Sequence, residues 1–442
     1  MPLLKWTVMV NLDTDRRQQL DIIQHDAFRY FLDFSDPDTG LVADTSLPGS
    51  PCSIAVVGFW LSCIPIGVER GWMTRNDAVA RTRRLLDFFL NSEQSDAPDA
   101  TGYRGFYYHF LDMKTGQRTW DSELSSIDTA FLIAGMITAS AYFQGDAQSE
   151  RDIRRVVTLL YERVDWRFME NESAMVFMGW KPETGFLPHV WQGYSEAIIL
   201  FVLGLASPTF ALSKDSYAQF AKSYTYLGEG AMRYLHAGPL FIHLFSHSWI
   251  DFRGLQDGQL NLDGADYFQN TQRAITAQQA YAEQNPNRFT GYGAGSWGLS
   301  ACGGPKGPRV LRDGRRMTML GYSARAVPFG PDDGTLIPWA GLACLPFNAD
   351  VAWQHFDHLM QTYPALLNHG RFPDSFNPSL RGRSRGPEGW VARRCSGLDQ
   401  GLLVMMIENY RTGQPWALIR ATDLVRRGLD LAGFTGGWLE CL

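Results

Sequence analysis

The sequence has no apolar run long enough to cross a membrane. A transmembrane helix needs about 18 or more apolar residues, and the longest apolar run, Ala197 to Ala206, has the length of a helix in a soluble core. The first residues, MPLLKWTVMVNLDTDRRQQ, contain a short apolar patch that Lys5 interrupts, without a small-residue cleavage site. We therefore expect no membrane span and a cytoplasmic protein as written, or a periplasmic one if an export signal has been trimmed or mis-assigned.

Basic stretches and paired cysteines are also missing. The 40 Lys and Arg against 46 Asp and Glu give a net charge of -6, and no basic stripe would attract nucleic acid. The six cysteines are scattered without a CxxC pair, which favours reduced thiols and excludes a zinc knuckle. A neutral partner fits this composition better than an anionic one.

No cofactor motif occurs either. The Gly-rich GYGAGSWG precedes no predicted helix, and there is no P-loop, dinucleotide fingerprint or GxSxG elbow. Cys395 lies beside Arg393 and Arg394 without an evident His partner, so we interpret it as structural. His243 and His247 stand four apart but lack the HExxH glutamate, and DGQLNLDGAD does not match an EF-hand, which leaves only a structural calcium open. We predict no cofactor and no catalytic metal.

Aromatic residues, by contrast, are abundant. Fourteen Trp and 17 Tyr exceed what packing alone requires, and the faces of such rings are what sugars stack on. The 442 residues favour one large domain, at 15–442, behind an N-terminal extension at 1–14.

Segments with helical periodicity alternate between fully apolar and amphipathic. The predicted helices are Asp13–Phe34, Ser53–Ile66, Thr74–Leu90, Asp128–Phe143, Glu150–Val164, Ala197–Ala206, Lys214–Ser223, Ala265–Glu283, Leu336–Leu345, Asp350–Tyr363, Leu398–Tyr410 and Pro415–Ala432. This alternation predicts an all-α, double-layered (α/α)6 barrel with long loops and a few short strands, including a hairpin in FYYHFLDMKTGQRTW. An α-solenoid and an α/β barrel remain alternatives, although no repeat period and no parallel-strand pattern support them.

Acidic residues stand at the start of three of the apolar helices. Glu196 follows Ser195, a potential N-cap, and Asp399 follows Ser396 by three residues. The third start, WDSELSSIDT, contains Asp121, Glu123 and Asp128. Such acids can be simple helix caps, but three of them could bring carboxylates to one end of a core, as two-carboxylate glycoside hydrolysis requires.

Four segments carry a resemblance to a known family. WDSELSSIDTAFLIAGMI, GYSEAIILFVLGLASP, FIHLFSHSWIDFRG and GLDQGLLVMMIENYRTGQPW resemble, in this order, the hallmark segments of the glucoamylase-like (Glycoamylase) domain. That group includes the endo-β-1,2-glucanases of glycoside hydrolase family 144 and is similar to the transglycosylating domain of cyclic β-1,2-glucan synthases. The resemblance implies an (α/α)6 barrel that acts on a glucan without a metal, and it favours β-1,2-linked glucan as the substrate.

The resemblance also implies roles for individual residues. Glu196 corresponds to the general acid, Asp399 to the base of the inverting members, and Glu123 to the nucleophile of the transglycosylating relatives. The remaining candidates would contact the sugars: Asp121, Asp128, Trp120, Trp180, His189, Trp191, Tyr194, His247, Trp249, Arg253, Trp297, Trp339, Asp374 and Asn377.

Electrostatics places a condition on these roles. A helix N-terminus lowers the pKa of a carboxyl group, so Glu196 can stay protonated only if burial or a second carboxylate raises its pKa. We expect no such conflict for Asp399, and we expect Glu123 to lie on a less fixed loop. The sequence thus predicts an inverting glycoside hydrolase. A retaining transglycosylase that uses Glu123, a non-catalytic glucan-binding protein and a polysaccharide lyase remain alternatives.

Overall fold

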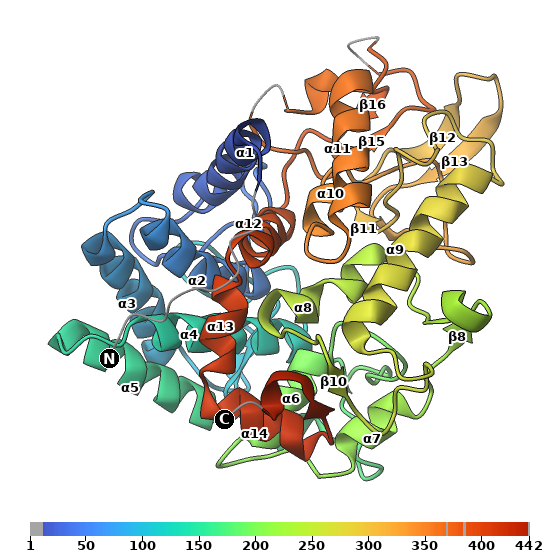
Figure 1. Ribbon diagram of the computed structural model, residues 1–442. Helices are drawn as coiled ribbons and strands as arrows, with labels where there is room; N and C mark the ends of the chain where they lie inside the picture. The colour runs from blue at the N-terminus through green and yellow to red at the C-terminus, as the bar shows by residue number, and fades with distance from the viewer. Residues whose placement is uncertain (1–11, 368–369, 383–385, 441–442) are drawn as a thin grey trace.

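The computed structural model describes residues 12–367, 370–382 and 386–440, so residues 1–11 of the predicted extension and Cys441 lie outside it. Within these ranges the chain forms 14 α-helices and 17 short strands (Figure 1). The helices are α1 (Thr14–Asp33), α2 (Ile54–Glu69), α3 (Arg75–Asn91), α4 (Ser126–Tyr142), α5 (Gln148–Arg163), α6 (Ile198–Ala206), α7 (Ser216–Ala221), α8 (Phe245–Trp249), α9 (Tyr267–Gln284), α10 (Ala340–Ala343), α11 (Ala349–Thr362), α12 (Gly397–Arg411), α13 (Gln414–Arg420) and α14 (Asp423–Leu431).

Helices buried along nearly their whole length alternate with helices that keep an exposed face. The buried set is α2, α4, α6, α8, α10 and α12, and the helix before each of them in the chain is partly exposed. α4 packs against α2 and α6, and α12 packs against α1, α2, α8 and α10. The predicted alternation of buried and amphipathic helices is therefore confirmed.

Two glycines allow α2 and α4 to lie close together. A Cβ atom at Gly135 would lie 2.1 Å from the carbonyl oxygen of Gly58, and one at Gly58 would lie 2.2 Å from that of Phe131. No side chain fits between the two backbones, so this helix crossing depends on both glycines.

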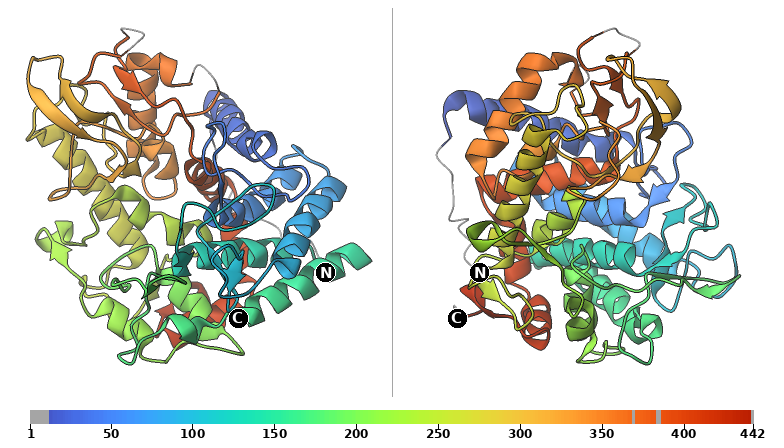
Figure 2. Two further views of the ribbon diagram at one scale, coloured as in Figure 1. Left: turned by 180° about the vertical axis from the view of Figure 1, so that it is seen from behind. Right: turned by 90° about the vertical axis from the view of Figure 1, so that its right-hand side faces the viewer.

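The strands are short and pair antiparallel. The largest sheet has the order β2 (Gly102–Tyr103), β3 (Phe106–Tyr108), β5 (Leu124–Ser125), β6 (Gly179–Lys181), β7 (Gly185–Phe186). The remaining pairs are β1 (Cys52–Ser53) with β4 (Phe110–Leu111), β8 (Tyr226–Leu227) with β9 (Tyr234–Leu235), β10 (Leu255–Gln256) with β17 (Thr435–Gly436), β11 (Ala301–Cys302) with β14 (Ser323–Ala324), β12 (Lys306–Val310) with β13 (Arg316–Leu320), and β15 (Phe376–Asn377) with β16 (Trp390–Val391). Figure 2 shows the large sheet and the β12–β13 hairpin on the side that faces away from the viewer in Figure 1. Because every strand pair of the described chain is antiparallel, the α/β-barrel alternative is wrong.

Several predicted boundaries differ from the structure. α8 lies in a segment that we predicted to be loop, because its five residues are too few for a periodic pattern. The predicted helix Leu336–Leu345 shortens to α10, since Pro338 disfavours helix at the preceding residue. The predicted helix Pro415–Ala432 divides into α13 and α14 around Thr422, the N-cap of α14. None of the helices in the described ranges is long and apolar enough to span a membrane.

Candidate active site

Asp128 is the acidic residue in the first turn of α4. Ser125 caps this helix: its hydroxyl accepts from the Asp128 N–H over 3.2 Å and donates to the Asp128 carboxylate over 2.5 Å. The side chain is buried, and burial raises the pKa of Asp128 even though the nearby charge of His109 opposes the increase. The cap therefore places a desolvated carboxyl group at this helix start.

His109 lies between Asp128 and Glu123. Its Nδ1 is 2.9 Å from Glu123 Oε1, and its Nε2 is 3.7 Å from Asp128 Oδ1. Burial lowers the pKa of His109, but the two carboxylates outweigh burial and raise the pKa to about 9, so the ring is an imidazolium at neutral pH. One oxygen or nitrogen from each of the three residues could reach a common metal ion. As the ring is placed, however, each nitrogen faces a different carboxylate, which is the arrangement of a cation between two anions.

Glu123 is held more firmly than the sequence predicted. It directly precedes β5, and its backbone carbonyl accepts from the His109 N–H over 2.9 Å. A Cβ atom at Gly179, on the neighbouring strand, would lie 2.8 Å from the Glu123 side chain. Burial alone would raise the pKa of Glu123, but the hydrogen bond and charge of His109 hold it below its ordinary value. Glu123 lies outside the strand, as expected for a loop residue, but its carboxylate is ionised and hydrogen-bonded to His109.

Glu196 lies just before α6 rather than inside its first turn. The helix begins at Ile198 with Ala197 as its N-cap, so the predicted cap at Ser195 is wrong. The Ser246 hydroxyl donates to the Glu196 backbone carbonyl over 2.6 Å and ties this turn to α8. Burial raises the pKa of Glu196 to about 7, and the charge of Asp128 adds to the increase. The residue keeps some contact with solvent although protein surrounds most of its carboxyl group.

Asp399 lies in the first turn of α12, 7% exposed, beside Asp374. Burial, and then the charge of Asp374, raises the pKa of Asp399 well above its ordinary value. The expectation that Asp399 is free of electrostatic conflict is therefore wrong. Arg394 Nε donates to Asp374 Oδ2 over 2.8 Å, and the Gly303 N–H donates to the same oxygen over 3.0 Å. These contacts favour the charge on Asp374, so Asp399 is the member of the pair that takes up a proton more readily.

Asp44 connects the two groups of acids. Burial raises the pKa of Asp44 to about 6, while the charges of His109 and Arg394 act to lower it. Its carboxyl group also interacts with the charges of Asp128 and Asp374, so it lies between the α4 side and the α12 side of the site. The charges of Asp44, Asp128, Glu196, Asp374 and Asp399 thus influence one another in a connected series.

A cavity of about 920 Å³ opens beside Asp374 and Arg394. Its wall includes Lys306 from β12, Tyr322 from just before β14 and Trp390 from β16. Tyr322 is 72% exposed, so one face of its ring is available to a ligand. The cavity has the size of a small-ligand site, and its combination of rings and charged groups suits a sugar.

Some of the predicted sugar-contacting residues lie near the acidic group. Trp120 is 65% exposed and packs on Phe110, which stacks on the His109 ring at 3.9 Å between centroids. Trp180 is part of β6, next to β5, and Trp339 lies close enough to Asp399 to affect its pKa. Asp121 is exposed in the turn after Trp120, and His189 is exposed in the loop before α6.

Other predicted residues lie in the core. Trp249 is fully buried and donates to the Ser62 hydroxyl over 2.9 Å, and the Trp191 indole donates to Ser126 over the same distance. His247 is buried against Thr271, and burial lowers its pKa to about 3. The structure gives packing contacts to these and to the other buried candidates, Tyr194, Trp297 and Asn377. Arg253 is exposed and pairs with Asp251.

From the sequence, we did not propose five residues of the site as functional. They are Asp44, His109, Tyr322, Trp390 and Arg394. Arg394 stood next to a cysteine that we interpreted as structural. His109 could have been noticed as the one polar residue within the aromatic run FYYHF, although its carboxylate partners follow only from strand pairing.

The sequence and the fold are similar to those of known proteins. The chain is 27% identical to an exo β-1,2-glucooligosaccharide sophorohydrolase (non-reducing end) from Parabacteroides distasonis, over 93% of this chain and 57% of that protein. A "putative glucoamylase" from Bacteroides uniformis superposes with a TM-score of 0.83 at 28% identity, covering 98% of this chain and 100% of the other. A β-1,2-glucanase from P. distasonis superposes with a TM-score of 0.80 at 25% identity, covering 94% of this chain and 60% of the other.

The chain therefore spans 57% of the length of the curated relative it matches. The family model for Glycoamylase, described as "Putative glucoamylase", matches residues 188–423, a segment that includes Glu196, Asp374 and Asp399. Since this match extends over more than half of the sequence, the chain belongs to the glycoamylase family.

Proposed function

We propose that this chain is a glycoside hydrolase that cleaves β-1,2-glucan or its oligosaccharides with inversion. The observation that carries the proposal is the connected group of acids at the starts of α4, α6 and α12, in which Glu196 has a pKa near neutrality. The sophorohydrolase and β-1,2-glucanase named above support the choice of linkage.

In this mechanism Glu196 is the general acid. A general acid must hold its proton at the working pH, and a pKa of about 7 allows this in neutral solution. Its carboxyl group gives the proton to the glycosidic oxygen as the bond to the anomeric carbon breaks, and the cleaved sugar leaves as an alcohol.

Asp399 is the general base. It removes a proton from the water that attacks the anomeric carbon on the opposite face of the sugar. Asp374 keeps the negative charge of the pair through Arg394 and Gly303, and its charge makes Asp399 the stronger proton acceptor once that residue has ionised. The reaction then ends with Glu196 as carboxylate and Asp399 protonated, and exchange with solvent restores both.

We also infer that the alternating helices close into an (α/α)6 barrel. Six buried helices preceded by six partly exposed ones support this arrangement, with α2, α4 and α6 neighbouring in order and α12 in contact with both α2 and α10. The acids then lie at one mouth of the barrel, where the long loops supply the cavity wall.

A retaining transglycosylase is the second candidate. It is favoured by one observation: His109 keeps the Glu123 carboxylate ionised and fixed, as a nucleophile must be. Under this alternative Glu196 would still be the acid, but a covalent glycosyl-Glu123 intermediate would form and an acceptor sugar could replace water.

The proposal can be tested on a panel of linear and cyclic β-1,2-glucans, sophoro-oligosaccharides, laminarin and starch, with the products resolved by size. We expect cleavage of the β-1,2-linked substrates, and a loss of about 10²- to 10⁴-fold in rate for Glu196→Gln. Glu172→Gln, in an exposed turn before β6, is the matched control and should keep the wild-type rate. Activity confined to starch, or an unchanged rate for Glu196→Gln, would contradict the proposal.

A further inference from the structure

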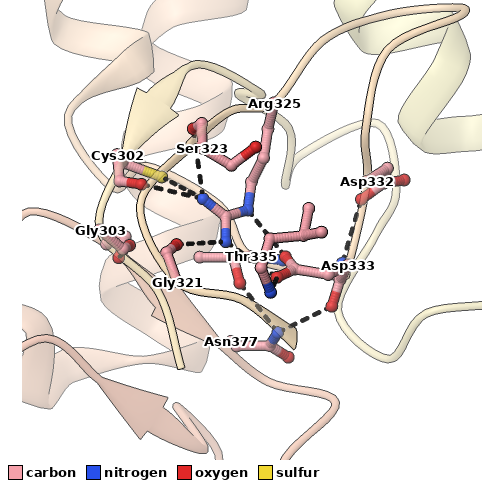
Figure 3. A network of polar contacts seen from close by, with 12 residues as sticks. Cys302, Gly303, Gly321, Ser323, Arg325, Asp332, Asp333, Thr335 and Asn377 are labelled. Atoms are coloured by element: carbon pink, nitrogen blue, oxygen red, sulfur yellow. Dashed lines mark hydrogen bonds and ion pairs between the residues drawn. The ribbon is translucent and has the colours of Figure 1, made fainter. Parts of the chain in front are cut away.

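Arg325 and Asp333 form an ion pair that has no contact with solvent (Figure 3). Arg325 Nε donates to Asp333 Oδ1 over 2.7 Å and Nη2 donates to Oδ2 over 2.8 Å, with both side chains 0% exposed. The carboxylate also accepts from the backbone N–H groups of Leu320 and Thr335. Replacing such a buried pair with apolar side chains is often neutral for stability or even stabilising. Stability of the fold is therefore a weak explanation for the pair.

The remaining N–H groups of Arg325 hold the backbone at the end of β11 and between β13 and β14. Nη1 donates to the carbonyl of Cys302 over 2.9 Å, and Nη2 donates to that of Gly321 over 3.1 Å. Figure 3 shows the guanidinium between these carbonyls and Asp333. Gly303 and Tyr322, the residues that follow the two carbonyls, both line the 920 Å³ cavity. Arg325 thus fixes the backbone directly behind the cavity wall.

Gly303 links this part of the backbone to Asp374 by a hydrogen bond. Its N–H donates to Asp374 Oδ2 over 3.0 Å, and a Cβ atom here would lie 2.7 Å from that oxygen and 2.8 Å from Arg394 Nη2. A Cβ atom on the next residue, Gly304, would lie 2.3 Å from Arg325 Nη2. Gly304 therefore lies directly against the buried guanidinium, and Gly303 lies directly against the Asp374 and Arg394 pair.

We propose that Arg325, anchored by Asp333, is a positioning residue that holds Gly303 against Asp374 and so fixes the carboxylate beside Asp399. The inference rests on the proposed function, in which Asp374 and Asp399 act together. A shift of about 1 Å in a positioned group costs on the order of 10²-fold in rate, and in metal sites the loss of a residue that supports a ligand costs about 10- to 100-fold. We expect an effect of this second size.

Arg325→Lys separates positioning from charge. A lysine keeps a positive charge next to Asp333, but its single ammonium group cannot also reach the carbonyls of Cys302 and Gly321 in the geometry of a guanidinium fork. We expect kcat on β-1,2-glucan to fall about 10- to 100-fold while KM changes less and the protein stays folded. A lysine variant with the wild-type kcat would show that the charge alone suffices, and would overturn the inference.

The double variant Arg325→Met with Asp333→Leu removes the pair without leaving a buried charge. Because no buried charge is left behind, we expect the double variant to fold, with a melting temperature lowered by the backbone groups that lose their partners, and to show the same fall in kcat per folded molecule. The matched control is Arg75→Met with Glu150→Leu, which removes a bidentate pair between α3 and α5 and should leave kcat unchanged.

The outcomes distinguish the positioning role of Arg325 from the proposed function of the protein. A folded double variant with wild-type kcat would overturn the positioning role alone, since wild-type hydrolysis would still stand. Wild-type protein that cleaves none of the glucans would contradict the proposed function, and the positioning role would fall with it.

Discussion

Asp128→Asn should move the alkaline limit of activity to lower pH. Under the proposed mechanism Glu196 acts in its protonated form, and its pKa is raised to about 7. At pH 6 a carboxyl group with this pKa is about 90% protonated, whereas one with an ordinary pKa near 4.3 is about 2% protonated. Activity must therefore fall as the pH rises through 7.

Two causes raise the pKa of Glu196, and only the charge of Asp128 can be removed by a substitution that leaves the burial of Glu196 unchanged. Burial is the larger cause and the charge of Asp128 the smaller one. We therefore expect the alkaline limb to shift down by up to about one pH unit, the lower end of the effect of a neighbouring charge. Asparagine has the shape of aspartate, so the cap with Ser125 can persist.

The assay is the pH dependence of kcat/KM on β-1,2-glucan, which reports the pKa values of the free enzyme. Asp146→Asn is the matched control: Asp146 is exposed just beyond the other end of α4, about 25 Å along the 17-residue helix, and its loss should not shift the limb. An alkaline limb that stays in place, or moves to higher pH, in Asp128→Asn would refute Glu196 as the titrating acid.

Three further predictions follow from the site. Asp44→Asn should raise the melting temperature at pH 8, where the buried charge opposes folding, and should raise it less at pH 5, below the folded pKa of about 6; equal gains at both pH values would contradict this. Tyr322→Ala should raise KM about 3- to 10-fold through lost stacking while Tyr322→Phe stays near wild type, and an unchanged KM in the alanine variant would remove Tyr322 from the substrate site. Excess EDTA should leave the initial rate unchanged, and inhibition that added Ca²⁺ or Zn²⁺ reverses would instead indicate a metal at His109, Glu123 and Asp128.

The buried helices could be predicted because their sequences are apolar on every side. A stretch of this kind can only be buried, so the burial of α2, α4, α6 and the Leu402–Ile407 stretch of α12 followed from composition along the chain. The acids at the helix starts could be located for the same reason, since the first residue of a buried helix lies at one end of the core. α8 was missed because Ser and His interrupt its apolar residues, and only tertiary contacts bury it.

The partners of the acids could not be predicted, because they depend on long-range pairing. His109 meets Glu123 through the register of β3 and β5, in which Tyr108 lies opposite Leu124. Asp374 and Arg394 meet across β15 and β16, 20 residues apart in sequence. Aromatic residues gave a similar difficulty: Trp249 and Trp120 look equally suited to stacking on sugars, but one is fully buried and the other is 65% exposed.

Proton NMR of the first product formed from β-1,2-glucan tests the account most directly, because it examines the linkage, the reaction and the pair of carboxylates together. With Glu196 as acid and Asp399 as base, water attacks opposite the leaving group, so the new reducing end should appear first as the α-anomer and only later equilibrate. Early appearance of the β-anomer, or transfer of the cleaved sugar to an added acceptor, would contradict the account and place the second catalytic role on Glu123.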